Sequence, residues 1–322
     1  MDLPFRQLFR VRRSGHESRE LRLSQVRDLV ALVKPRITLM VVATGAVGLY
    51  LAPIAPASET KLGLLLGLTL LVGGANALNM YLERDIDGRA ERTKNRPLPA
   101  GRLAPGLALT LSICLGVLAL LWLGIVVNPL TAVLGLLAFV SYTACYTPMK
   151  QISPGALVVG AVPGAMPPLM GWTAATGQLD LAGLTLFSIM FLWQLPHFIA
   201  IALFRSEDYR RAGYKTLVSE LGERTAKFQV VLYLLLLCPV SLLLVPMGIG
   251  GKLYLWTALL AGLGFLVVGV QGLRPSAGIR WARNLFKASL LYLMVVFGAM
   301  LAGHALQGGD APSLYAAGQH AG

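Results

Sequence analysis

The feature that most constrains this chain is a succession of long apolar stretches. A helix needs about 20 consecutive apolar residues to cross the hydrocarbon core of a bilayer. With 56% of its residues hydrophobic and only 13% charged, the chain is expected to be an all-α polytopic membrane protein, a bundle of about nine transmembrane helices around a central cavity. The predicted spans are residues 37–55, 62–82, 105–125, 129–148, 155–175, 181–203, 227–248, 253–273 and 285–306.

The basic residues are distributed very unevenly between the segments that join these spans. If the N-terminus is cytoplasmic, 26 of the 28 Lys and Arg residues fall on the cytoplasmic side, and only Lys61 and Lys252 fall on the other. Cytoplasmic loops of membrane proteins carry such an excess of positive charge. We therefore predict a cytoplasmic N-terminus and a C-terminus outside. The same asymmetry explains the net charge of +13, so no nucleic-acid partner is expected.

The chain is expected to divide into three parts. Residues 1–33 are polar and rich in Arg, with Leu and Phe interleaved, which predicts an arm that lies on an anionic membrane surface. Residues 34–306 contain the predicted spans and form the intramembrane domain. Residues 307–322 are expected to be a short flexible tail.

The most informative polar residues follow the second span. Asn79, Glu83 and Asp87 recur every four residues, so on a helix their oxygen-bearing side chains form one stripe. Mg²⁺ prefers one or two carboxylates together with water and substrate phosphates. Arg and Lys bind phosphate oxygens, and several follow the stripe. We predict that the stripe is catalytic and holds Mg²⁺ and a diphosphate, which is also bound by Arg84, Lys94 and Arg96.

A second loop on the same predicted side repeats this arrangement after the sixth span. Asp208 is expected to be the catalytic Mg²⁺ ligand that this second loop supplies, and Glu207 beside it is the less suitable candidate for that role. Arg210 is expected to bind the diphosphate. The simpler interpretation is that both loops carry charge only to fix the topology, because charge runs are commonly solvated. For any single basic residue the two interpretations fit equally well.

Several short motifs resemble those of the intramembrane prenyltransferases of the UbiA type. The first loop is similar to their N-x-x-x-[DE]-x-x-x-D box, and the second to their second acidic box. Further stretches resemble the branch of this family that prenylates haem. They are residues 34–38 (KPRIT), 79–101, 146–150, 160–172, 196–198, 208–213 and 282–293, so the resemblance covers most of an intramembrane prenyltransferase domain at 34–306.

This resemblance implies an Mg²⁺-dependent transferase with two substrates. Farnesyl diphosphate ionises at C1, and the 2-vinyl group of haem B captures the allylic cation. Addition of water then gives the hydroxyethylfarnesyl group of haem O. The expected location is a bacterial inner membrane, with the mitochondrial inner membrane as the alternative. The expected partners are the lipid bilayer and a haem A synthase or haem–copper oxidase assembly factors.

His197 lies well inside the sixth predicted span. The haem context suggests that it contacts the haem, whereas a histidine within a membrane helix more often forms a hydrogen bond to another helix.

Three other interpretations remain open. A related prenyltransferase that acts on a quinone precursor or on chlorophyllide would share the first box but not residues 160–172 and 196–198. A transporter with acidic ion sites would place acids near the bilayer midplane, whereas the acids here lie at helix ends, in loops or in tails. A purely structural membrane subunit would leave both acidic–basic loops unexplained.

Overall fold

The computed structural model describes residues 24–91 and 93–307. In these residues the chain forms helices, turns and bends, and no β-strand. Most of the predicted N-terminal arm and nearly all of the predicted C-terminal tail lie outside the described residues. The part of the arm that is described forms a helix, Ser24–Leu32, in which Leu32 is fully buried.

Eight helical segments are long and apolar enough to cross a membrane by themselves, by length and composition. The short helix pair Ser24–Leu32 and Pro35–Tyr50 (α2), bent by 41° at its break, adds a ninth if it is counted as one span. The eight segments are Ser58–Leu82 (α3), Pro105–Val127 (α5 and η1), Pro129–Met149 (α6, η2 and α7), Ala156–Thr176 (α8), Leu181–Phe204 (α9), Leu217–Leu242 (α11), Gly251–Gln271 (α12) and Ile279–Leu306 (α13). All of the predicted spans overlap these helices.

Two predicted boundaries differ clearly from the structure. The first span ends at Tyr50 and not at 55, because Pro53 follows and disfavours helical geometry in the residue before it. The seventh begins at Leu217 and ends at Leu242, whereas residues 227–248 were predicted. Thr216 caps the start of α11 through Ser219, and Gly222, with φ 83°, joins this polar first segment to the apolar helix. Polar residues that resemble a loop in the sequence are therefore helical.

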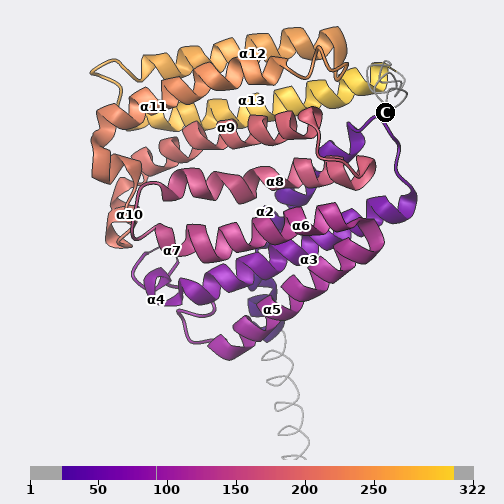
Figure 1. Ribbon diagram of the computed structural model, residues 1–322. Helices are drawn as coiled ribbons and strands as arrows, with labels where there is room; N and C mark the ends of the chain where they lie inside the picture. The colour runs from indigo at the N-terminus through magenta and orange to yellow at the C-terminus, as the bar shows by residue number, and fades with distance from the viewer. Residues whose placement is uncertain (1–23, 92, 308–322) are drawn as a thin grey trace, which may run out of the picture.

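The long helices lie roughly side by side, and the short helices Arg84–Asp87 (α4), Thr147–Met149 (α7) and Ser206–Arg211 (α10) lie together at one end of the bundle (Figure 1). Helix α3 packs against α5, α2 against α8, and α9 against α8, α11 and α13. The ends of segments that are far apart in the sequence therefore meet at this end of the molecule.

Helices α2 and α8 approach each other so closely that their backbones touch. A Cβ atom added to Gly48 would lie 1.9 Å from the carbonyl oxygen of Pro168, and one added to Gly171 would lie 2.0 Å from that of Gly45. Because lipid chains are as apolar as Leu, helices in membranes associate through such close packing of small residues. These glycines bring α2 and its preceding residue, Lys34, against the centre of the bundle.

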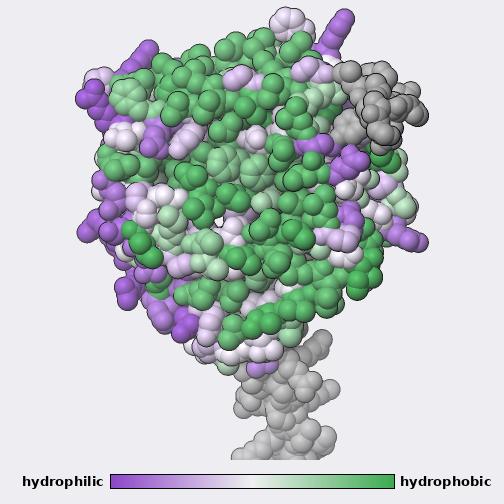
Figure 2. Space-filling model, in the orientation of Figure 1, coloured by the Kyte–Doolittle hydropathy of each residue, from purple (hydrophilic) through white to green (hydrophobic). Residues whose placement is uncertain are grey.

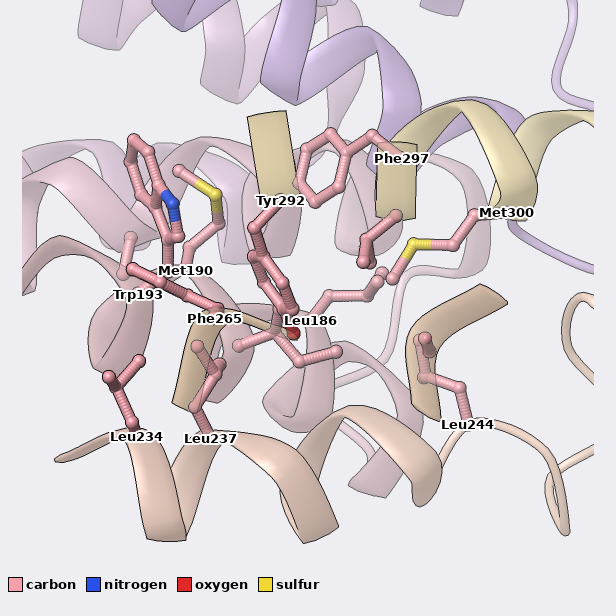
Figure 3. Packing of buried hydrophobic residues seen from close by; sticks show 14 of the residues in the cluster. Leu186, Met190, Trp193, Leu234, Leu237, Leu244, Phe265, Tyr292, Phe297 and Met300 are labelled. Atoms are coloured by element: carbon pink, nitrogen blue, oxygen red, sulfur yellow. The ribbon is translucent and has the colours of Figure 1, made fainter. Parts of the chain in front are cut away.

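The largest cluster of buried apolar residues lies between α8, α9, α11, α12 and α13. Figure 3 shows Trp193 of α9, Leu237 of α11, Phe265 of α12 and Tyr292 of α13 converging there. The outer surface is also apolar: hydrophobic residues cover the middle of the face in Figure 2, and hydrophilic residues gather towards the helix ends. Exposed side chains such as Ile125 belong to the surface that faces lipid.

Candidate active site

A cavity of about 680 Å³ opens at the end of the bundle where α4, α7 and α10 lie. Charged and aromatic side chains line its polar part, and apolar side chains of α8, α9 and α13 line its other walls. The polar and aromatic lining residues include Lys34, Asn79, Glu83, Asp87, Arg96, Tyr142, Tyr146, Lys150, Phe198, Tyr214 and Phe286. Small-molecule sites typically occupy concave, mostly apolar pockets with a few convergent polar groups, and this cavity has that character.

The predicted stripe of oxygen donors forms at the wall of this cavity. Helix α3 ends at Leu82 and α4 begins at Arg84, yet the four-residue repeat of backbone hydrogen bonds continues across the junction. Glu83 N donates to Asn79 O at 2.9 Å, and Asp87 N donates to Glu83 O at 2.8 Å. The three side chains therefore share one face, and their residues are only 2–4% exposed.

Each member of the stripe has a basic partner. Lys150 Nζ lies 2.5 Å from Glu83 Oε1, and Arg96 Nη1 lies 2.6 Å from Asp87 Oδ2. Lys34 Nζ donates to Asn79 Oδ1 at 2.9 Å. A buried carboxylate that lacked such a partner would be strongly destabilising. The cavity wall thus holds two carboxylates and one amide, each in contact with one basic side chain.

Lys34 and Lys150 are site residues that sequence reasoning did not identify as such. Both lie in motifs that resemble the prenyltransferases, but a single Lys at a helix end is also the usual topological charge. Burial lowers the pKa of Lys34 to about 7, and the nearby positive charge of Arg96 acts in the same direction. Burial also opposes the charge of Lys150, but Tyr146 and Glu83 beside it hold its pKa above the ordinary value.

Aromatic side chains surround the ammonium group of Lys150. Its Nζ lies 4.4 Å from the ring centroid of Tyr146 and 5.7 Å from that of Tyr214. Tyr146 ends a π-helical segment, Ser141–Tyr146 (η2), and such segments are frequent at functional sites. A Cβ atom at position 160 would lie 2.5 Å from the Tyr146 ring, so glycine at this position of α8 leaves room for that ring.

The second acidic box lies beside the stripe but outside the main cavity. Asp208 is half exposed and forms an ion pair with Arg205 at 3.5 Å. Asp208 and Asp87 line a small pocket of about 30 Å³ between α4 and α10. Glu207 turns towards the surface, where it accepts hydrogen bonds from Arg210 and Arg211.

Three of the basic residues predicted to bind diphosphate do not line the cavity. Arg84 donates to the carbonyl oxygen of Tyr81, Lys94 pairs with Glu91 at 2.6 Å, and Arg210 pairs with Glu207 at 2.8 Å. Only Arg96 of the predicted set faces the stripe. Lys94 lies in the loop that follows α4, and its side chain is 45% exposed.

The oxygen donors of the stripe suit a metal ion whose remaining ligands come from the substrate and from water. Among the described residues, no three His, Cys, Asp or Glu side chains converge closely enough to hold a metal by themselves. Glu83 and Asp87 do face the same cavity as Asn79. Mg²⁺ is commonly bound by one or two carboxylates plus substrate phosphates and water, so the residues present suit Mg²⁺ with a diphosphate.

Glu83 also lines a second pocket. Its volume is about 420 Å³, and its walls come from the end of α3 and from η2 and α7. Glu83 is shared between this pocket and the main cavity, whereas most of the other lining residues are apolar or small: Leu78, Leu82, Thr143, Ala144, Thr147 and Pro148.

His197 lies one aromatic ring away from the cavity. It is 9% exposed, and its Nδ1 lies 2.7 Å from Ser289 Oγ on α13. Its ring stacks on Trp193 at 4.9 Å and contacts Phe286 at 4.8 Å. Phe286 in turn lines the cavity. His197 thus forms the helix-to-helix hydrogen bond that was one of its two predicted roles.

The sequence and the fold are similar to those of known proteins. The model of the UbiA prenyltransferase family matches residues 40–306. The protoheme IX farnesyltransferase of Myxococcus xanthus is 49% identical over 273 residues, 85% of this chain and 93% of that protein. The one of Sorangium cellulosum is 51% identical over 239 residues, 74% of this chain and 85% of that protein.

Solved structures show the same fold at low sequence identity. A digeranylgeranylglyceryl phosphate synthase superposes with a TM-score of 0.76 at 17% identity, covering 87% of this chain and 98% of that one. A UbiA homolog from Archaeoglobus fulgidus bound to GPP and Mg²⁺ superposes with a TM-score of 0.67 at 16% identity, covering 85% of this chain and 99% of that one.

Proposed function

The chain belongs to the UbiA prenyltransferase family, and we propose that it transfers the farnesyl group of farnesyl diphosphate to the 2-vinyl group of haem B, which yields haem O. The similarity to protoheme IX farnesyltransferases over most of the chain supports the choice of substrates. The observation that carries the chemistry is the pairing of Glu83 with Lys150 and of Asp87 with Arg96 in one cavity.

Asn79, Glu83 and Asp87 hold Mg²⁺, and Asp208 adds a carboxylate from the adjoining small pocket. The metal, when bound, neutralises the charge that develops on the departing diphosphate. The ion pairs in the stripe hold the carboxylates in place before the substrate binds. The A. fulgidus homolog, which shares the fold and binds GPP and Mg²⁺, supports the choice of Mg²⁺ as the metal.

Lys34, Arg96 and Lys150 bind the oxygens of the diphosphate. All three line the cavity beside the stripe, and each already contacts one of its members. Cations at fixed positions stabilise the transition state more than the ground state, because the diphosphate gains negative charge as it leaves. Arg84, Lys94 and Arg210 lie at the surrounding surface and attract the anionic substrate over a longer range.

The bond changes are those of an ionisation followed by capture. The C1–O bond of farnesyl diphosphate breaks, and pyrophosphate leaves with the electron pair. The π electrons of the vinyl group form a bond to C1, water adds to the cation on the macrocycle side chain, and a proton is released. Apolar side chains such as Leu157, Phe198 and Phe286 line the cavity and exclude competing water from the allylic cation.

The site faces the cytoplasm of a bacterial cell. Bacterial relatives and the placement of Lys and Arg support an inner-membrane protein with a cytoplasmic N-terminus and a C-terminus on the opposite side. Haem O leaves through the bilayer to a haem A synthase or to haem–copper oxidase assembly factors.

The test is to incubate membranes that contain the protein with haem B, farnesyl diphosphate and Mg²⁺, and to separate the haems by mass. We expect a haem heavier by one farnesyl group plus water, and its loss on addition of EDTA. Prenylation of 4-hydroxybenzoate or another aromatic acceptor in place of haem would show that haem is not the acceptor. The assignment of the diphosphate site would still stand. No product with any acceptor would favour the transporter hypothesis.

A further inference from the structure

The side-chain amide of Asn79 lies between two polar side chains that fix its orientation. On one side, Lys34 Nζ donates to Asn79 Oδ1 at 2.9 Å. On the other side, Asn79 Nδ2 donates to Thr147 Oγ1 at 3.2 Å. Asn79 and Lys34 line the main cavity, whereas Thr147 lines the second pocket. The oxygen end of the amide is therefore the end directed to a residue of the main cavity.

The hydrogen bonds of Thr147 determine which end of the amide it accepts. Thr147 Oγ1 lies 2.8 Å from the carbonyl oxygen of Tyr142. A carbonyl oxygen only accepts, so the hydroxyl proton of Thr147 is donated to Tyr142. The lone pairs of the hydroxyl oxygen then accept from a donor, and the NH₂ group of Asn79 is that donor. Thr147 therefore selects the nitrogen end of the amide.

A π-helical turn places Thr147 for this contact. In an α-helix, a threonine hydroxyl group bonds the carbonyl oxygen three or four residues earlier. Thr147 instead bonds that of Tyr142, five residues earlier. Its backbone N–H donates to the same carbonyl oxygen, as the residue that follows the π-helical segment Ser141–Tyr146 (η2). The wider turn thus sets where the Thr147 hydroxyl group stands relative to α3.

The reverse orientation of the amide is unfavourable at both ends. It would turn the NH₂ group of Asn79 towards the ammonium group of Lys34, which only donates. It would also turn Asn79 Oδ1 towards the oxygen of Thr147, whose proton is already donated to Tyr142. Asn79 and Thr147 are only 2% and 3% exposed, so water does not compensate for a lost bond. One orientation of the amide satisfies all four groups.

We propose that Thr147 is a positioning residue, which holds the Asn79 amide so that its oxygen, and not its nitrogen, is available to the metal. This inference rests on the proposed function, in which Asn79 binds Mg²⁺ together with Glu83 and Asp87. Mg²⁺ takes oxygen ligands, so the nitrogen end of an amide cannot serve it. Residues that orient a metal ligand typically change the metal affinity 10- to 100-fold when they are removed.

The decisive experiment measures metal binding without turnover. The full-length protein, purified in detergent, is dialysed to equilibrium against Mn²⁺, which takes the same oxygen ligands as Mg²⁺, at one fixed concentration of inorganic pyrophosphate. Thr147→Val keeps the shape of the side chain but removes the hydroxyl group, and should weaken Mn²⁺ binding about 10- to 100-fold. Thr147→Ser keeps the hydroxyl group and should retain the wild-type affinity. Thr147→Ala removes the same hydroxyl group and replaces Thr147→Val if that variant does not fold.

Thr143→Val is the matched control for a purely structural effect. Thr143 lies in the same π-helical segment, is 5% exposed and lines the same pocket as Thr147. Its hydroxyl group donates to the carbonyl oxygen of Phe139 at 2.7 Å. Both valine variants lose a buried hydrogen bond, so thermal unfolding should record a loss of stability in each, but only Thr147→Val should lose affinity for Mn²⁺. Equal losses of affinity, or wild-type affinity in Thr147→Val, would overturn the proposal.

A second comparison tests whether the effect of Thr147 passes through the amide. In Asn79→Asp the side chain ends in two oxygens, so either orientation presents an oxygen to the metal. In this background Thr147→Val should weaken Mn²⁺ binding by no more than about twofold, and the difference between the two backgrounds is the coupling that a double-mutant cycle measures. The same loss in both backgrounds would show that Thr147 does not act through Asn79.

These outcomes separate this inference from the proposed function. If haem O forms normally and Thr147→Val binds Mn²⁺ as the wild-type protein does, the positioning role is wrong and the transferase activity stands. If only Thr147→Val loses affinity for Mn²⁺ but the wild-type protein produces no haem O, the transferase activity is wrong and the positioning role stands. A wild-type protein that binds no Mn²⁺ with pyrophosphate would overturn the metal assignment and the positioning role together.

Discussion

Lys150 Nζ and Glu83 Oε1 lie 2.5 Å apart, although 67 residues separate them in the chain. The contact joins the residue after α3 to the residue after α7, and both side chains are largely buried. Lys150 also contacts two tyrosine rings of the same cavity. One side chain thus fixes a carboxylate of the stripe and provides a cation for the diphosphate.

Replacing Lys150 should therefore affect both stability and turnover. Lys150→Met keeps the length of the side chain but leaves Glu83 buried without its partner, which should cost about 3–5 kcal/mol of stability. Lys150→Arg keeps the charge and should lose less stability and less turnover. Thermal unfolding in detergent and haem O formation are the measurements. Wild-type turnover in Lys150→Met would show that this cation does not act on the diphosphate.

Asp87 and Asp85 provide a matched pair within one short helix. Asp87 faces the cavity and pairs with Arg96, whereas the Asp85 side chain is 78% exposed. Asp87→Asn removes a negative ligand and should lower turnover at least about 100-fold, while the protein remains in the membrane. Asp85→Asn should leave turnover near the wild-type level. Equal effects of the two substitutions would contradict the assignment of Asp87 to the metal.

The contact between α2 and α8 can be tested with alanine. In Gly171→Ala the new Cβ would meet the carbonyl oxygen of Gly45, so the two helices must separate, at a cost of about 1–3 kcal/mol. Gly264→Ala on α12 is the control, because its Cβ position has no described heavy atom within 4 Å apart from the adjacent backbone of its own helix. Thermal unfolding in detergent measures the stability of both variants. An unchanged stability of Gly171→Ala would show that this helix pair is loosely packed.

The part of the site that sequence predicts is the part set by local periodicity. The four-residue repeat of Asn79, Glu83 and Asp87 requires only helical geometry, which persists across the short break at Glu83. The spans follow from apolar length in the same way. The limits of the seventh span do not follow from apolar length. Capping by Thr216 starts a short polar helix, and a kink at the non-helical Gly222 joins it to the apolar helix.

The part that sequence does not predict depends on which helix ends meet. Lys34 joins the site because glycines let α2 pack against α8, and Lys150 joins it because α7 ends beside α3. Neither contact can be derived from spacing along the chain. Conversely, Lys94 and Arg210 follow acidic residues in sequence, but each pairs with an acid three residues away, at the surface.

The pKa of Lys34 leads to a pH-dependent prediction. Burial lowers it to about 7, so the free protein releases this proton as the pH rises through 7, whereas a bound diphosphate favours the charged form. Binding of Mg²⁺–pyrophosphate should therefore take up a proton above pH 7 and weaken as the pH rises towards 9. Calorimetry in two buffers of different ionisation enthalpy measures the uptake. Lys34→Arg stays charged throughout and should remove the part of the uptake that Lys34 contributes. Identical uptake in both proteins would assign the proton to pyrophosphate or another group.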